Sequence, residues 1–151
     1  MKKFFIIIAF FTGLTFNLNA ETKRIVSGNV NAKITIIAYE SLTCSHCADF
    51  HKEVYPKLKK DYIDTGLAKI EFRHFPLDIA ALNASKIAQC KQDQSLKILE
   101  SLYSNQQAWV KGNTIEEVNE NLKKFLQNEG FNIDFEKCIN DKDIEDFVLN
   151  D

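Results

Sequence analysis

The sequence predicts an α/β protein in which one strand–helix–strand unit is followed by a block of helices. Residues 33–39 form a short apolar run with the composition of a buried strand, and residues 69–75 are expected to form a second strand. Between them, apolar residues recur at intervals of three and four, which is the period of a helix. From residue 78 onward the pattern is helical. The chain has no internal repeat and no linker rich in Pro, Gly or Ser, so residues 21–151 are expected to form one domain.

Residues 1–20 have the composition of a cleavable secretory signal. Met1-Lys2-Lys3 is positively charged, residues 4–16 form an apolar run, and Ala20 is a small residue before the expected cut. The apolar run is short for a bilayer span, and an uncleaved N-terminal anchor is the alternative. The signal holds two lysines and no acid, so the formal net charge of −2 becomes −4 without it. With no basic stripe in the remainder, nucleic acid is excluded as an expected partner.

The first strand, 33–39, leads into the first helix. Four apolar residues recur along this helix: Cys47, Phe50, Val54 and Leu58. Their spacing predicts one buried face on a helix that runs to about Lys60. Pro56 lacks an amide donor, so a kink is expected there. The second strand, 69–75, should pair with the first in parallel, because a helical crossover joins them.

The helical block divides at turn residues and caps. We expect helices at Ile79–Cys90, Ser95 to about Val110 and Thr114–Asn128, with one or two short helices in Phe131–Asp151. Thr114 and Glu117 form a capping box, Gly130 ends that helix, and Asp141 is suited to cap the last one. Nothing after Phe75 has the pattern of a third strand. The edge of the first strand should therefore be open, with unpaired amides and apolar side chains exposed to water.

Cys44 and Cys47 lie three residues apart where the first strand gives way to the helix. At a first turn, the Cys44 sulfur would face unpaired backbone amides, whose partial positive charge favours the thiolate. We predict that Cys44, the more exposed thiol, is the nucleophile and that Cys47, the more buried, resolves the mixed disulfide. His46, as an imidazolium or as a donor, would further stabilise the Cys44 thiolate and make the disulfide more oxidising.

Other interpretations of these residues remain open. The Cys44–Cys47 pair could form a purely structural disulfide, although so tight a loop adds little stability. It could also bind zinc, since His51 follows on the same helical face and His74 could supply a fourth ligand; a second CxxC is absent. Glu40, at the end of the strand, is either a solvated carboxylate or the acceptor of the proton released when Cys47 attacks.

The stretch Tyr39–Cys47 (YESLTCSHC) resembles the DsbA-like branch of the thioredoxin superfamily. The likeness extends from about Ile25 to Val148. It includes Phe50-His51-Lys52-Glu53, Tyr55-Pro56, the run from Phe72 to Asp78 (FRHFPLD), and Gln107-Ala108-Trp109 in what looks like the family's helical insertion. The resemblance implies a thioredoxin-like fold with this insertion at about 78–151. His46 matches the family's common dipeptide, whereas Ser45 stands where proline is more usual.

This resemblance implies a periplasmic protein thiol–disulfide oxidoreductase that oxidises cysteine pairs in exported proteins. Cys44 would be the nucleophile and Cys47 the resolving thiol, with reduced exported proteins as substrates and a membrane partner as re-oxidant. No cofactor and no metal are expected. Cys90 and Cys138 are either two buried thiols or a disulfide worth roughly 4 kcal/mol in the chain-entropy model. The resemblance favours the disulfide, because some family members carry a second, non-catalytic one in this region.

The sequence departs from the family pattern after the insertion. The family returns there to two antiparallel strands, a cis-proline loop that faces the CxxC, and a last helix. The prolines of this chain, Pro56 and Pro76, do not lie where that proline would. We therefore expect the last two strands, the cis-proline loop and the final helix to be lacking. An inactive remnant of such an oxidase is the alternative to an active enzyme.

Overall fold

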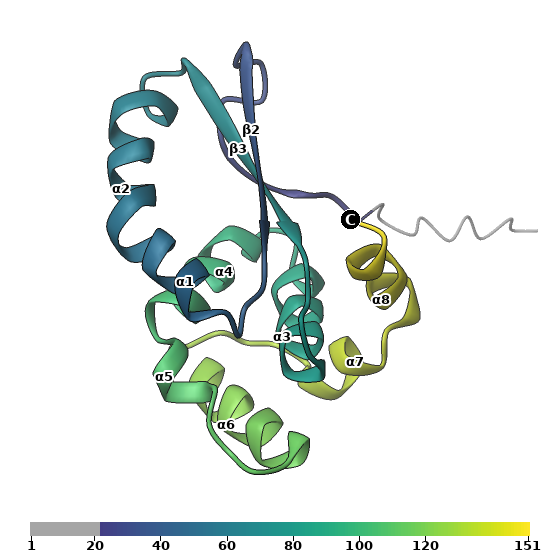
Figure 1. Cartoon of the computed structure of the whole chain (residues 1–151). Helices are drawn as coiled ribbons and strands as arrows, with labels where there is room; N and C mark the ends of the chain where they lie inside the picture. Colours follow the sequence, from purple (N-terminus) through teal and green to yellow (C-terminus); the bar gives the residue numbers. More distant parts are fainter. Residues whose placement is uncertain (1–21) are drawn as a thin grey trace, which may run out of the picture.

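The computed structural model describes residues 22–151, and the predicted signal at 1–20 lies outside them. One sheet contains three strands, β1 (Ile25–Gly28), β2 (Ile34–Glu40) and β3 (Ala68–His74), in the order β1-β3-β2. In Figure 1, α1 and α2 run along one side of the strands, and α3 to α8 gather toward the carboxyl ends of β2 and β3. The prediction of an α/β protein with a separate helical block is confirmed.

The pairing of β2 with β3 is parallel, as the sequence predicts, and opposes Ile36 to Ile70. The expectation of only two strands is wrong, because β1 pairs antiparallel with β3 and opposes Ile25 to Phe72. Only four residues long, β1 alternates buried Ile25 and Ser27 with more exposed neighbours. So short a run carries too few positions for its period to identify it from the sequence.

Strand β2 lies at an edge of the sheet. Its outward side chains Ile37 and Tyr39, and Ile34 at its start, are 45%, 57% and 57% exposed. On β3 the opposite face is buried through Ile70 and Phe72. Across residues 22–151 no strand follows β3, so the β2 edge is unpaired there, as the sequence predicts.

The first helix is a continuous coil with two π-helical turns. It consists of α1 (Ser45–Asp49), a π turn at Phe50–Val54, α2 (Tyr55–Leu58) and a second π turn at Lys59–Ile63. Pro56 sits in the first turn of α2, just after a π turn, where its missing amide is tolerated. The inserted residue shifts the buried face by one position. Val54 is therefore 51% exposed, contrary to the predicted pattern, whereas Tyr55 and His51 are buried.

The helical block has six helices within the described residues. They are α3 (Ile79–Cys90), α4 (Ser95–Ser104), α5 (Gln106–Trp109), α6 (Ile115–Asn128), α7 (Phe135–Asn140) and α8 (Lys142–Leu149). The single helix expected at 95–110 is interrupted at Asn105, which has non-helical dihedral angles. The Thr114 hydroxyl accepts from the Glu117 amide, and Asp141 caps α8, as predicted. Gly130, with φ of 79°, follows the end of α6.

One apolar core joins the sheet to the helical block. Trp109, Leu102 and Tyr103 are buried in it, and the Trp109 indole nitrogen donates to the Leu102 carbonyl at 2.9 Å. These three side chains therefore belong to the core that the helical block shares with the sheet. Among residues 22–151, none of the helices combines the length and apolar character that a membrane crossing requires.

Candidate active site

Cys44 lies at the junction between the sheet and the first helix. The Cys44 amide donates to the Ser41 carbonyl at 3.1 Å, just after β2 ends. Cys44 occupies the N-cap position of α1, with φ of −77° and ψ of 119°. Cys47 follows one turn later on the same helix. Both are partly exposed free thiols, so the structure describes the reduced dithiol. The motif therefore sits at a helix start, where the sequence places it.

The environment of the Cys44 sulfur favours its ionisation. The Cys47 thiol and the Cys47 amide have the largest effects and lower the pKa of Cys44; burial opposes them, the His46 amide lowers the pKa further, and the Glu40 charge has the smallest, opposing effect. Two of these donors are the backbone amides expected at a helix start. The effect of the Cys47 thiol, which is the largest, is not predicted from the sequence. Together these donors favour the Cys44 thiolate.

Cys47 has the opposite character. Burial raises the pKa of Cys47 to about 11, helped by the neighbouring Cys44 and by the Glu40 charge. In the reduced pair the Cys47 thiol, which resists ionisation, thus donates a hydrogen bond to the Cys44 thiolate. This asymmetry is the arrangement that thiol–disulfide exchange through a single attacking sulfur requires.

His46 reaches Cys44 through its backbone rather than its ring. The imidazole is 94% exposed, and its Nδ1 lies 3.9 Å from Asp49 Oδ2. The interaction with the Cys44 sulfur comes from the His46 amide. The predicted help from the imidazole thus has no contact supporting it in this structure, and it stays a prediction.

Near the motif, Glu40 and His51 form a buried pair that the sequence does not predict. Glu40 Oε2 and His51 Nε2 are 2.7 Å apart, and their side chains are 8% and 3% exposed. The His51 ring stacks on Tyr103 at 4.0 Å between centroids and also contacts Phe72. Glu40 is therefore not the solvated carboxylate of the simpler interpretation. Only the position of His51 one turn after Cys47, on the same helix, signals this pair in the sequence.

The zinc interpretation of the motif is not supported. The Nε2 atom of His51 is occupied by Glu40, and His74 is buried at the end of β3. Within residues 22–151, no group of three or more His, Cys, Asp and Glu side chains is arranged to hold a metal ion.

A cleft of about 370 Å³ lies beside the motif. Its walls come from the first helix, through Ser45, Asp49 and Lys52, and from the end of α4 and α5. A larger open hollow of about 1050 Å³ lies near β1, α4 and α8. Neither cysteine of the motif lines either hollow, but Ser45 and Ala48, which line the smaller cleft, directly follow Cys44 and Cys47 in the sequence.

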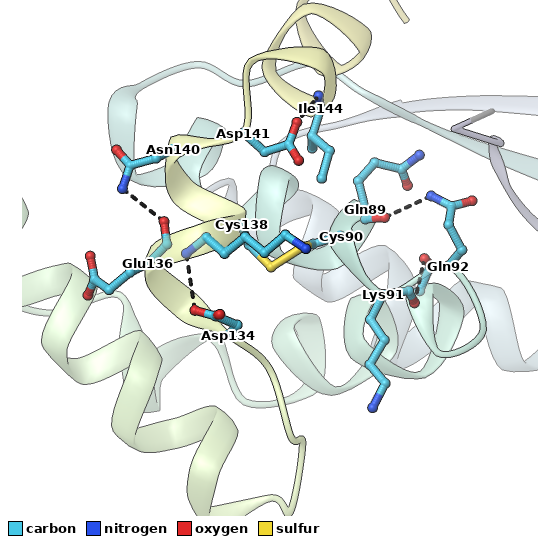
Figure 2. The surroundings of a disulfide bond; sticks show 12 residues. Gln89, Cys90, Lys91, Gln92, Asp134, Glu136, Cys138, Asn140, Asp141 and Ile144 are labelled. Carbon is cyan, nitrogen blue, oxygen red and sulfur yellow. Dashed lines mark hydrogen bonds between the residues drawn. A yellow bond between two sulfur atoms is a disulfide. The ribbon is translucent and has the colours of Figure 1, made fainter. Parts of the chain in front are cut away.

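The other two cysteines form a disulfide. Figure 2 shows Cys90, at the end of α3, joined to Cys138 in α7, with a Cα–Cα distance of 5.6 Å. This is the pairing that the resemblance implies. Asp134, whose side chain caps α7, lies beside the bond in the same view. The disulfide thus ties two helices of the block together, apart from the Cys44–Cys47 pair.

A sheet strand that ends in a CxxC motif at a helix start, beside an appended helical block, defines the thioredoxin-like class with a helical insertion. A family model described as Thioredoxin matches residues 20–151. The crystal structure of Wolbachia pipientis alpha-DsbA1 superposes with a TM-score of 0.73 and 36% identity, covering 83% of this chain and 63% of that one. A protein-disulfide isomerase structure from Novosphingobium aromaticivorans, at 19% identity and a TM-score of 0.70, shares the fold.

A curated relative from Rickettsia bellii bears the provisional name protein-disulfide oxidoreductase. It is 32% identical over 127 residues, which are 82% of this chain and 48% of the relative. The chain belongs to the thioredoxin family, in its DsbA-like branch. It spans about half the length of the curated relatives that it matches.

Proposed function

We propose that this chain is an exported protein thiol–disulfide oxidoreductase that oxidises cysteine pairs in other exported proteins through Cys44 and Cys47. The observation that carries the proposal is the asymmetry of the two thiols. The pKa of Cys44 is lowered by donors at the start of α1, while that of Cys47 is raised to about 11 by burial. The family membership and the names of the relatives point to the same chemistry.

The oxidised form would react in two exchanges. A substrate thiolate attacks the Cys44 sulfur of the Cys44–Cys47 disulfide, and Cys47 leaves as a thiolate and takes up a proton. A second substrate thiolate then attacks the substrate sulfur of the mixed disulfide, and Cys44 leaves. The substrate loses two electrons and gains a disulfide, while the enzyme gains two electrons. A thiol of low pKa leaves faster, so the environment of Cys44 favours donation of disulfides.

Glu40 is the group that we assign to proton exchange with Cys47. Its charge raises the pKa of both thiols, and its carboxylate is held in place by the His51 ring. A buried carboxylate in this position can accept the proton that the Cys47 thiol loses when it attacks a mixed disulfide. The carboxylic acid formed in this way can return that proton when Cys47 later leaves as a thiolate. We assign to His46 a share in stabilising the Cys44 thiolate, through its amide.

The setting of the reaction is proposed from the sequence. The signal-like segment 1–20 favours export to the periplasm, with 21–151 as the mature domain. Reduced exported proteins would be substrates, and a membrane partner would return the Cys44–Cys47 pair to the disulfide. Relatives from Bacillus are named disulfide bond formation protein D, and these names support a role in forming disulfides in other proteins.

Transfer to a synthetic dithiol peptide tests the proposal. The oxidised chain should convert the peptide to its disulfide, and Cys44→Ser should abolish this transfer. A Cys90→Ala/Cys138→Ala variant is the control and should retain it, because that pair lies outside the motif. Undiminished transfer by Cys44→Ser would overturn the mechanism, whereas no transfer by the unaltered chain would favour the inactive-remnant alternative.

A further inference from the structure

Gln106 connects the helical block to the loop that carries Cys44. It is the first residue of α5 and is 7% exposed. Its side-chain Nε2 donates to the Leu42 carbonyl at 2.9 Å and to the Cys44 carbonyl at 3.0 Å. A primary amide has two hydrogens, and here each points to one of the carbonyls that flank Thr43.

The other hydrogen bonds of the loop leave the Leu42 carbonyl to Gln106. The Cys44 amide donates to the Ser41 carbonyl, the Thr43 hydroxyl donates to Asp78 Oδ2 at 2.8 Å, and the Leu77 amide donates to the Ser41 hydroxyl at 3.4 Å. Leu42 is buried, so its carbonyl would be costly to leave without a donor. Gln106 is therefore the side chain that satisfies backbone acceptors on both sides of the turn leading into α1.

We infer that Gln106 is a positioning residue for the redox motif, holding the 42–44 segment so that the Cys44 sulfur stays aimed at the amides of the helix start. This inference rests on the proposed function, since it assumes that Cys44 is the reacting thiol. The Cys44 carbonyl also accepts the Ala48 amide at 3.2 Å, in the first turn of α1. The Cys44 carbonyl thus accepts hydrogen bonds both from the first turn of α1 and from Gln106 in α5.

The geometry explains why the effect would reach the sulfur. The amides of His46 and Cys47 lower the pKa of Cys44 only while Cys44 keeps its extended N-cap conformation. Without Gln106, Leu42 and Cys44 lose a fixed donor, and the segment can turn away from the amides. The helical block would in this way contribute to the reactivity of a residue 62 positions earlier in the chain.

Paired substitutions test the inference. Gln106→Met keeps the side-chain length and removes both donors, and Gln107→Met makes the same change at an exposed neighbour. The pH dependence of the iodoacetamide alkylation rate of Cys44, followed by mass spectrometry in the reduced full chain, gives its pKa. We expect Gln106→Met to raise this pKa by at least about half a unit, a threefold loss of thiolate at low pH. Gln107→Met should match the unaltered chain.

Urea unfolding of each variant separates positioning from stability. A folded Gln106→Met with an unchanged Cys44 profile would overturn the inference, even if the variant is less stable. Should Gln106→Met fail to fold, Gln106→Asn decides by the same criterion, because its shorter amide cannot reach both carbonyls. If Cys44 of the unaltered chain titrates like a free cysteine, the proposed function fails instead.

Discussion

Removal of the disulfide between Cys90 and Cys138 should cost the protein much of its stability. The bond closes a segment with a sequence separation of 48 and anchors α7 to α3 (Figure 2). In the chain-entropy model, a loop of this length restricts the unfolded chain by about 4 kcal/mol. Cys138 is 2% exposed within the core, so an alanine there also leaves a small gap. We expect Cys90→Ala/Cys138→Ala to lose roughly 3–5 kcal/mol of the free energy of unfolding.

Urea unfolding followed by Trp109 fluorescence measures this loss. With a slope of about 2 kcal/mol per molar urea, the midpoint should fall by roughly 2 M. Cys44→Ala/Cys47→Ala is the matched control and should change the midpoint little, because these thiols are free in the described state. A loss below about 1 kcal/mol in the Cys90/Cys138 variant would refute the view that this crosslink holds the helical block in place.

Three further outcomes follow from single side chains. Because the Glu40 charge adds to burial in raising the pKa of Cys47, Glu40→Gln should lower that pKa when Cys44→Ala/Glu40→Gln is compared with Cys44→Ala in a thiolate-absorbance titration. Burial lowers the pKa of His74, against the charge of Asp151, so the unfolded chain takes up this proton more readily than the folded one. The contribution of His74 to the free energy of unfolding should therefore be fully present above about pH 6.5 and be lost as the pH falls below that value. Urea midpoints of His74→Gln should fall less over the same pH range than those of the unaltered chain. Thr114→Ala removes the cap of α6 and should cost about 1 kcal/mol in the same urea assay.

Local features of this fold could be predicted from the sequence. The helical pattern after Asp78 predicts a helix at Ile79–Cys90, and the structure gives the same residues for α3. The start of α6 at Ile115 follows from Thr114, whose hydroxyl accepts an amide three residues on. The place of Cys44 at the helix start depends on neighbouring residues alone. In each case the determining interactions span only a few positions.

Features that depend on distant contacts could not be predicted in this way. Glu40 and His51 lie on different elements, and their hydrogen bond exists only because the π turn of the first helix brings His51 next to the end of β2. That same turn moved the buried face from Val54 to Tyr55, which a regular helical period cannot anticipate. In the sequence Gln106 has no feature that distinguishes it from other polar residues. Its role depends on the fold, which places it against the loop before α1.

The acidity of one thiol is the direct test of the whole account. Absorbance of the thiolate, titrated from pH 3 to 10 in the reduced full chain and compared with Cys44→Ser, isolates the ionisation of Cys44. The donors around its sulfur predict a pKa below the value of about 8.5 for a free cysteine. A Cys44 that titrates at or above that value would contradict the account, because the helix start would then give this sulfur no advantage as nucleophile or leaving group.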